Sequence, residues 1–184
     1  MRLGYLLERA GRSDEAAATY EAVLLRWPQR ADVRVRVASL LLRSGHDVAA
    51  RLHLERVLAD DPENVAALNN LALLAANDDA QLDAASALVA RAVACEPSRP
   101  ALHDTSGFIA WRRGAIDAAR ADLQRALDLS NGTYAEAHYH MALVDLSTDD
   151  VKRGAASLRR ALALDYDSDA EWSADARRRL ADLR

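Results

Sequence analysis

The sequence predicts an all-α protein, a solenoid of about five helix-turn-helix repeats followed by a C-terminal capping helix. The chain is rich in alanine and leucine, with only 7 glycines and 4 prolines among 184 residues, and this composition favours helices over strands. Small and turn-forming residues recur every 34 or 35 positions. Within each period, aliphatic residues follow the three- and four-residue spacing of a helix buried along one side.

Three columns of equivalent residues define the period. The column that closes each repeat holds Pro28, Pro62, Pro97, Asn131 and Tyr166. The column early in each second helix holds Ala16, Ala50, Ala85, Ala119 and Gly154. The column in the middle of each first helix holds Gly4, Ala38, Ala72, Gly107 and Ala142. Small residues in the last two columns indicate that the two helices of a repeat cross closely.

The predicted repeats span about residues 1–30, 31–64, 65–99, 100–134 and 135–168 of an array at 1–166. The first helices carry the aliphatic pairs Leu3/Leu6, Val37/Leu40, Leu71/Leu74 and Met141/Val144, with Ser106/Ile109 in repeat four. The second helices carry similar stripes, from Tyr20, Val23 and Leu24 to Leu158, Ala161 and Leu162. Residues 169–184 have alanine and leucine at helical spacing and a polar opposite face, which is typical of a capping helix.

The junction inside each repeat has its own turn residues. Gly11, Gly45 and Gly114 are predicted to end the first helices of repeats one, two and four in a left-handed turn. Repeats three and five have the pairs Asp78-Asp79 and Asp149-Asp150 instead, which can cap the helix that follows.

Repeat one shows the full pattern of Gly4, Ala16, Tyr20 and Pro28, and in this it resembles the tetratricopeptide repeat (TPR) family. The resemblance runs from Met1 to Tyr166 and implies a right-handed superhelical α-solenoid. Because repeat one begins part-way through its first helix, we interpret Met1 as a boundary inside a longer array.

Four residues depart from the family pattern. They are Asn131 and Tyr166 in place of proline, Gly154 in place of alanine, and Arg34 in a column that is usually apolar. An extra residue also falls within residues 131–134. We therefore expect repeats four and five to be irregular.

The charge and hydropathy of the chain argue against some classes of partner and location. Charged residues make up 28% of the chain with a net charge of -4, which argues against nucleic-acid binding. The sequence has no apolar run long enough for a membrane span and no N-terminal signal peptide. The chain has 24 basic residues, and Lys152 is the only lysine among them. Because of this strong preference for arginine over lysine, we expect a bacterial protein. We expect it to be soluble, in either the cytoplasm or the periplasm.

Candidate catalytic and metal-binding residues are few. His103, Asp104 and Ser106 supply the residue types of a nucleophilic triad, but on a helix Asp104 points away from the edge shared by the other two. His138 and His140 diverge by about 200° on a helix and cannot bind one metal ion together. Cys95 is the single cysteine, expected as an inert, half-buried thiol. We predict no enzyme activity, no metal and no cofactor.

The TPR resemblance implies that the first helices line a concave groove that binds a peptide or a partner protein. The groove residues predicted from its outward-facing columns are Tyr5, Ser39, Leu42, Arg43, Asn69, Leu73, Asn77, Asp104, Phe108, Trp111, Arg112, Tyr139 and Leu143. Trp111 could instead pack between two repeats rather than face the groove. Asn69 and Asn70 have no lysine near them, so a carboxylate clamp for chaperone tails is not predicted.

We therefore predict a non-catalytic scaffold for protein–protein interaction. The runs at residues 69–75, 104–114 and 135–144 also resemble TPR proteins that accompany exosortase/PEP-CTERM exopolysaccharide export systems, which implies a role in exopolysaccharide or envelope assembly. The alternatives are a regulatory or targeting segment of a larger enzyme and, on weaker grounds, a helical-repeat RNA binder. The apolar ends of the array predict possible self-association.

Overall fold

The computed structural model describes residues 1–165 and 171–183, and this part of the chain is α-helical apart from one 3-10 helix and connecting loops, without a strand. The all-α prediction is therefore confirmed. Tyr166 and the start of the predicted capping segment lie outside the described residues, and the predicted repeat limits stay predictions. The chain divides into two compact units, an N-terminal unit at Met1–Cys95 and a C-terminal unit at Glu96–Arg184.

The N-terminal unit contains three pairs of helices. They are α1 (Arg2–Arg9) with α2 (Ser13–Arg26), α3 (Ala31–Arg43) with α4 (Asp47–Asp60), and α5 (Val65–Ala75) with α6 (Leu82–Cys95), the last pair joined through the 3-10 helix η1 (Asp79–Gln81). Each helix packs against its partner, and α3 also packs against α2 and α5. The first helices α3 and α5 thus lie beside each other.

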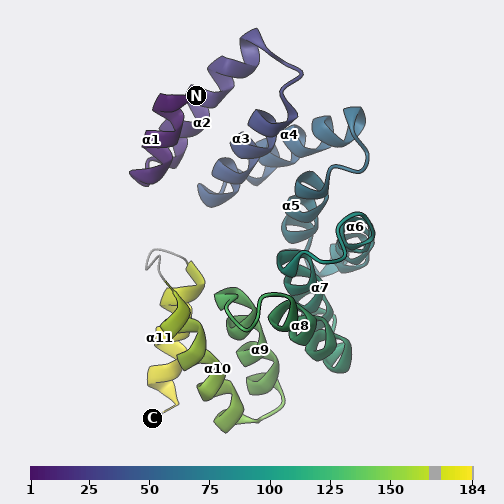
Figure 1. Ribbon diagram of the computed structural model, residues 1–184, viewed down its shortest axis with the longest axis vertical. Coiled ribbons are helices and arrows are strands. Elements are labelled where there is room, and N and C mark those ends of the chain that lie inside the picture. Colours follow the sequence, from purple (N-terminus) through teal and green to yellow (C-terminus); the bar gives the residue numbers. More distant parts are fainter. Residues whose placement is uncertain (166–170, 184) are drawn as a thin grey trace. The chain divides into compact units, whose positions relative to one another are not determined.

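The C-terminal unit repeats this arrangement with α7 (Pro100–Arg112) and α8 (Ile116–Leu129), then α9 (Ala135–Ser147) and α10 (Val151–Leu164), and ends with α11 (Glu171–Asp182). The pairs α7 with α8 and α9 with α10 lie side by side, and α11 packs on α10 and α9 (Figure 1). No described helix is long and apolar enough to cross a membrane.

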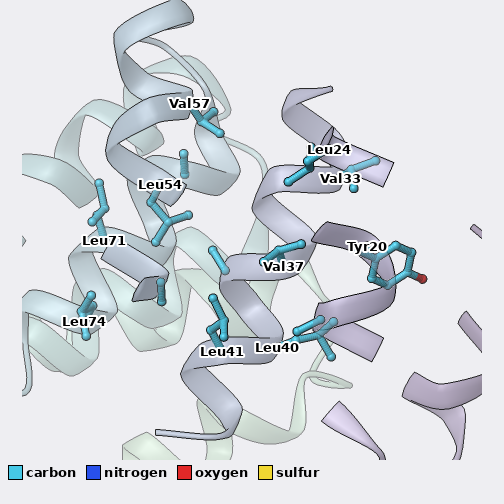
Figure 2. Packing of buried hydrophobic residues seen from close by; sticks show 14 of the residues in the cluster. Tyr20, Leu24, Val33, Val37, Leu40, Leu41, Leu54, Val57, Leu71 and Leu74 are labelled. Carbon is cyan, nitrogen blue, oxygen red and sulfur yellow. The ribbon is translucent and has the colours of Figure 1, made fainter. Parts of the chain in front are cut away.

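The aliphatic columns form the core. In the N-terminal unit, Tyr20, Val37, Leu54 and Leu71 come from four successive helices and belong to one cluster of buried side chains (Figure 2). Val37 and Leu54 are 0% exposed, and replacing a buried leucine with alanine typically costs about 2–5 kcal/mol. Burial of these columns therefore stabilises the packing of neighbouring helices.

The small-residue columns allow the two helices of a pair to approach closely. A Cβ atom on Gly107 would lie 2.6 Å from Leu123 Cγ, and one on Gly4 would lie 2.7 Å from the Tyr20 ring. The equivalent Ala38 is 0% exposed. Alanine therefore fits at position 38, whereas at Gly4 and Gly107 even the Cβ atom of alanine would press on the partner helix.

The junctions inside the repeats follow their turn residues. Gly11, Gly45 and Gly114 have φ values of 71°, 74° and 75°, a region that glycine enters without steric cost. In repeat five, Asp149 takes a φ of 59°, and the Asp150 carboxylate caps α10 by accepting a hydrogen bond from the backbone N–H of Arg153 at 3.1 Å.

The expected irregularity of repeats four and five is wrong for their helices. Helices α7 and α9 have 13 residues and α8 and α10 have 14, the same lengths as α3 and α4. The loop takes up the extra residue, because Asn131 and Gly132 adopt φ values of 52° and 70° there.

Arg34, which departs from the usual apolar column, has a specific structural role. Its guanidinium donates a 2.8 Å hydrogen bond to the carbonyl of Pro28 in the preceding loop. Two histidines in the same column donate to equivalent loop carbonyls, His103 to Pro97 at 2.8 Å and His138 to Gly132 at 3.1 Å. A polar side chain here thus satisfies a backbone acceptor that would otherwise lack an intramolecular partner.

Candidate functional site

The triad-like residues on α7 bind three separate partners. His103 reaches the loop carbonyl of Pro97, Ser106 Oγ donates to Asp122 Oδ2 at 2.6 Å, and Asp104 Oδ1 accepts from His140 Nδ1 at 2.8 Å. A serine nucleophile needs its base and the orienting acid to converge on one point. The observed contacts instead tie α7 to its loop, to α8 and to α9.

The other chemistry candidates are also separated in space. His138 and His140 contact a loop carbonyl and Asp104, respectively. Among the described residues, no group of three or more His, Cys, Asp or Glu side chains could hold a metal ion. Cys95 is exposed rather than half-buried, because it is the last residue of α6.

In the N-terminal unit, the predicted groove residues of α3 and α5 are all exposed or partly exposed. We call this set the α3–α5 surface; it comprises Ser39, Leu42, Arg43, Asn69, Leu73 and Asn77, the last beyond the end of α5. Arg43 and Asn77 are exposed and the other four are partly exposed. The predicted Tyr5 lies on α1 and is 49% exposed.

Polar contacts order this surface. Asn70 Nδ2 donates to Ser39 Oγ at 3.0 Å, and the Ser39 hydroxyl donates to the carbonyl of Val35 at 3.1 Å. The neighbouring Asn69 Oδ1 is buried and accepts no hydrogen bond. A buried acceptor without a donor costs about 1–3 kcal/mol.

In the C-terminal unit, more of the predicted groove residues are buried by packing against neighbouring helices. Asp104, Tyr139 and Leu143 are only 5%, 9% and 5% exposed, whereas Phe108, Trp111 and Arg112 stay partly exposed on α7. Trp111 Nε1 donates to Ser147 Oγ of α9 at 3.3 Å, so this indole joins two first helices as well as facing solvent.

Five rings form a continuous row from α7 through α9 to α11. We call them the aromatic row: Trp111, Phe108, His140, Tyr139 and Trp172. Successive ring centroids lie 5.9, 4.8, 5.4 and 5.7 Å apart, within the range of favourable tilted ring contacts. The row gives this side of the unit a stiff apolar surface with electron-rich faces.

Negative charge collects beside the middle of the aromatic row, where Asp104 is bonded to His140. Burial, and then the nearby Asp104 charge, raise the pKa of Glu136 above its ordinary value. Burial, Asp104 and Glu136 likewise raise the pKa of Tyr134, whose hydroxyl is hydrogen-bonded to Glu136. Two partly enclosed carboxyl groups thus lie near each other, with His140 bonded to one of them.

Helix α11 contributes Trp172, the last ring of the aromatic row, and also bonds to Tyr139. Tyr139 Oη donates to Asp175 Oδ2 at 2.7 Å, and burial together with this bond raises the pKa of Tyr139 to about 12. Although burial opposes ionisation of Asp175, hydrogen bonds from Arg179 and Tyr139 hold the pKa of this carboxyl below its ordinary value.

Sequence reasoning missed Glu136, His140, Trp172 and Asp175 as site residues. A usable signal exists, because the contacts Asp104–His140, Trp111–Ser147 and Tyr139–Asp175 all join residues 36 apart. A first-helix residue therefore meets the residue one repeat and one position further along. The columns of equivalent residues align positions that are 34 or 35 apart. They therefore did not pair side chains that are 36 positions apart.

Comparison with known proteins decides the family. Two tetratricopeptide repeat models match the sequence, at residues 7–71 and 48–100, and together they span residues 7–100. The chain belongs to the tetratricopeptide repeat family. No curated protein matches the sequence.

Solved TPR structures share the fold. A thermophilic TPR protein of Thermus thermophilus superimposes with a TM-score of 0.84 at 24% identity, covering 100% of this chain and 96% of that one. MamA from Desulfovibrio magneticus RS-1 gives 0.68 at 17% identity, covering 92% and 94%. A chain of the APC/C hetero-tetramer Cut9–Hcn1 gives 0.77 at 19% identity, covering 96% of this chain but 35% of that one. At these identities the likeness is one of fold.

Proposed function

We propose that this TPR chain is a non-catalytic scaffold that binds a peptide or a segment of a partner protein along its first helices. TPR proteins generally act in protein–protein interaction, and the groove residues predicted for this chain lie on such helices. The observation that carries the proposal is the 3.0 Å bond from Asn70 Nδ2 to Ser39 Oγ, which joins α5 to α3 one helical turn from the partly exposed Leu42 and Leu73.

The composition of the α3–α5 surface supports binding of a peptide. Leu42 and Leu73 are partly exposed aliphatic side chains, Asn77 is an exposed amide, and Arg43 is an exposed cation. Apolar anchors next to a few polar groups are the usual make-up of a protein-binding surface. Because the bond between Asn70 and Ser39 links α5 to α3, a ligand would meet a surface that is ordered before it binds.

A synthetic peptide array tests the proposal, followed by fluorescence anisotropy of the retained peptides with the full chain. We expect Leu73→Ala and Asn69→Ala each to weaken binding by about 1–2 kcal/mol. Leu52→Ala is the matched control, since Leu52 is 63% exposed on the second helix α4. Unchanged affinity in Leu73→Ala and Asn69→Ala would exclude the α3–α5 surface as the binding site.

Exopolysaccharide or envelope assembly is the pathway we propose for this scaffold. The support is the sequence resemblance of residues 69–75, 104–114 and 135–144 to TPR proteins of exosortase-associated systems. Genome neighbourhood is the direct test: exosortase or polysaccharide-export genes beside this gene support the assignment, and their absence across related genomes counts against it.

Self-association through α1 is a further proposal. Leu3 and Leu6 are 60% and 55% exposed, whereas their column equivalents Val37 and Leu40 are 0% and 2% exposed. In α3 that face packs on a second helix, and a second copy of the chain carries such helices. Light scattering of the wild type and of the Leu3→Gln/Leu6→Gln variant tests this: a dimer lost in the variant supports it, and a monomeric wild type refutes it.

A further inference from the structure

We propose that the C-terminal unit recognises a basic side chain of its peptide partner at the partly exposed Glu136, reinforced by the charge of the buried Asp104, with a neighbouring apolar side chain of that peptide against Phe108 and Trp111. This inference rests on the proposed scaffold function and specifies the chemistry of the ligand. It also adds Glu136, a residue outside the predicted groove set, to the binding surface.

Charge complementarity selects a cation. Glu136 lies one helical turn before His140 on α9, and His140 is bonded to Asp104, so both carboxyl groups lie near the same imidazole. Both are at least partly shielded from water. His140 is the bonded partner of Asp104 and supplies at most one positive charge for two carboxylates. Arg99 also acts on this cluster, but it is paired with Glu96 at 3.1 Å. A lysine or arginine from a ligand would compensate the remaining negative charge.

The rings favour the same ligand. The Phe108 ring lies 4.8 Å from the His140 ring, and His140 is bonded to Asp104, so the apolar and acidic parts of the surface are continuous. The faces of aromatic rings attract cations, and the aliphatic stem of a lysine or arginine packs well on them. Phe108 and Trp111 are both partly exposed and leave room for an adjacent apolar residue.

Three hexapeptide libraries with randomised flanks test the proposal, with a central Lys-Leu, Gln-Leu or Glu-Leu pair. Each is screened against the full chain, and the best sequence is measured by anisotropy in its lysine and glutamine forms. We expect the lysine form to bind more tightly, and Glu136→Gln to weaken it by about fivefold without changing the glutamine form. Phe108→Leu, which keeps apolar volume but removes the ring face, should weaken it by about threefold.

Glu63→Gln is the matched control, because it removes the same charge from an exposed loop residue of the N-terminal unit. Thermal melts of each variant verify folding. If retained peptides show no lysine preference, or if Glu136→Gln leaves the lysine form unchanged, the inference is overturned while peptide binding by the scaffold stands. If no library is retained, or if binding is insensitive to changes on both the α3–α5 surface and α7, the scaffold proposal is overturned too.

Discussion

His140 Nδ1 donates a 2.8 Å hydrogen bond to Asp104 Oδ1 and thereby joins α9 to α7. The two side chains are 16% and 7% exposed, respectively. Their contact is enclosed by the neighbouring rings of Phe108 and Tyr139. It links two repeats at the place where the aromatic row meets the carboxyl groups of Asp104 and Glu136. The same side chains therefore hold the repeats together and form part of the proposed binding surface.

Replacing Asp104 should destabilise the chain. Asp104→Ala removes the carboxylate acceptor and leaves the His140 N–H partly buried without a partner. We expect the free energy of unfolding to fall by about 2–3 kcal/mol, measured by urea denaturation followed by circular dichroism. In a double-mutant cycle with His140→Ala, the two residues should be coupled by at least about 1 kcal/mol. Additive losses would mean that the contact contributes little.

Gly107 offers a test of close helix crossing. Alanine is the better helix former by about 1 kcal/mol, but its Cβ would lie 2.6 Å from Leu123 Cγ and 3.1 Å from the Ala119 carbonyl oxygen. We expect Gly107→Ala to lower stability by about 1–3 kcal/mol. Leu123→Ala removes the side chain that clashes with the new Cβ. The double variant should therefore lose less stability than the sum of the losses in the two single variants. A Gly107→Ala variant more stable than wild type would rule out a tight crossing.

The raised pKa of Glu136 predicts a pH dependence of stability. Burial and the Asp104 charge raise this pKa above 4.5 in the folded state, so the folded chain binds the proton more tightly than the unfolded chain does. The wild type therefore loses stability as pH rises from the unfolded value through the raised folded value. Glu136→Gln lacks this loss, and its stability relative to wild type should grow across that window. Urea midpoints between about pH 4 and 8 measure it; a constant difference would contradict the prediction.

Docking of α11 should depend on the Tyr139 hydroxyl. Tyr139→Phe keeps the ring contact with Trp172 but removes the 2.7 Å bond to Asp175, at a cost of about 1 kcal/mol. We expect faster hydrogen exchange of α11 amides in this variant, with α8 unchanged. Tyr5→Phe is the control, since Tyr5 is 49% exposed and should leave α11 exchange as in the wild type.

Much of the fold was predictable from the sequence because the repeat imposes local rules. The helical stripes, the glycines at left-handed junctions and the small residues at Gly4, Ala38 and Gly107 each act within one pair of helices. The role of Arg34 was not predictable, because its acceptor is a backbone carbonyl of the preceding loop, which the pattern of side chains does not reveal.

The sequence predicts a candidate site on the first helices, and this location stays a prediction, but the sequence could not show which of its side chains are buried. Columns identified Phe108, Trp111 and Asp104 as outward-facing residues. They could not show that Asp104 and Tyr139 are enclosed by contacts with His140 and Asp175. Those partners lie 36 residues away, a separation that depends on how successive repeats are offset.

The sequence by itself determined the all-α class, the repeat period and the residues at which helices cross, because these depend on side-chain size and spacing along one chain segment. Only the tertiary structure decided which first-helix side chains remain available to a partner. Availability depends on the neighbouring repeat: α9 covers Asp104 and α11 covers Tyr139, while Leu42 and Leu73 of the α3–α5 surface stay partly exposed.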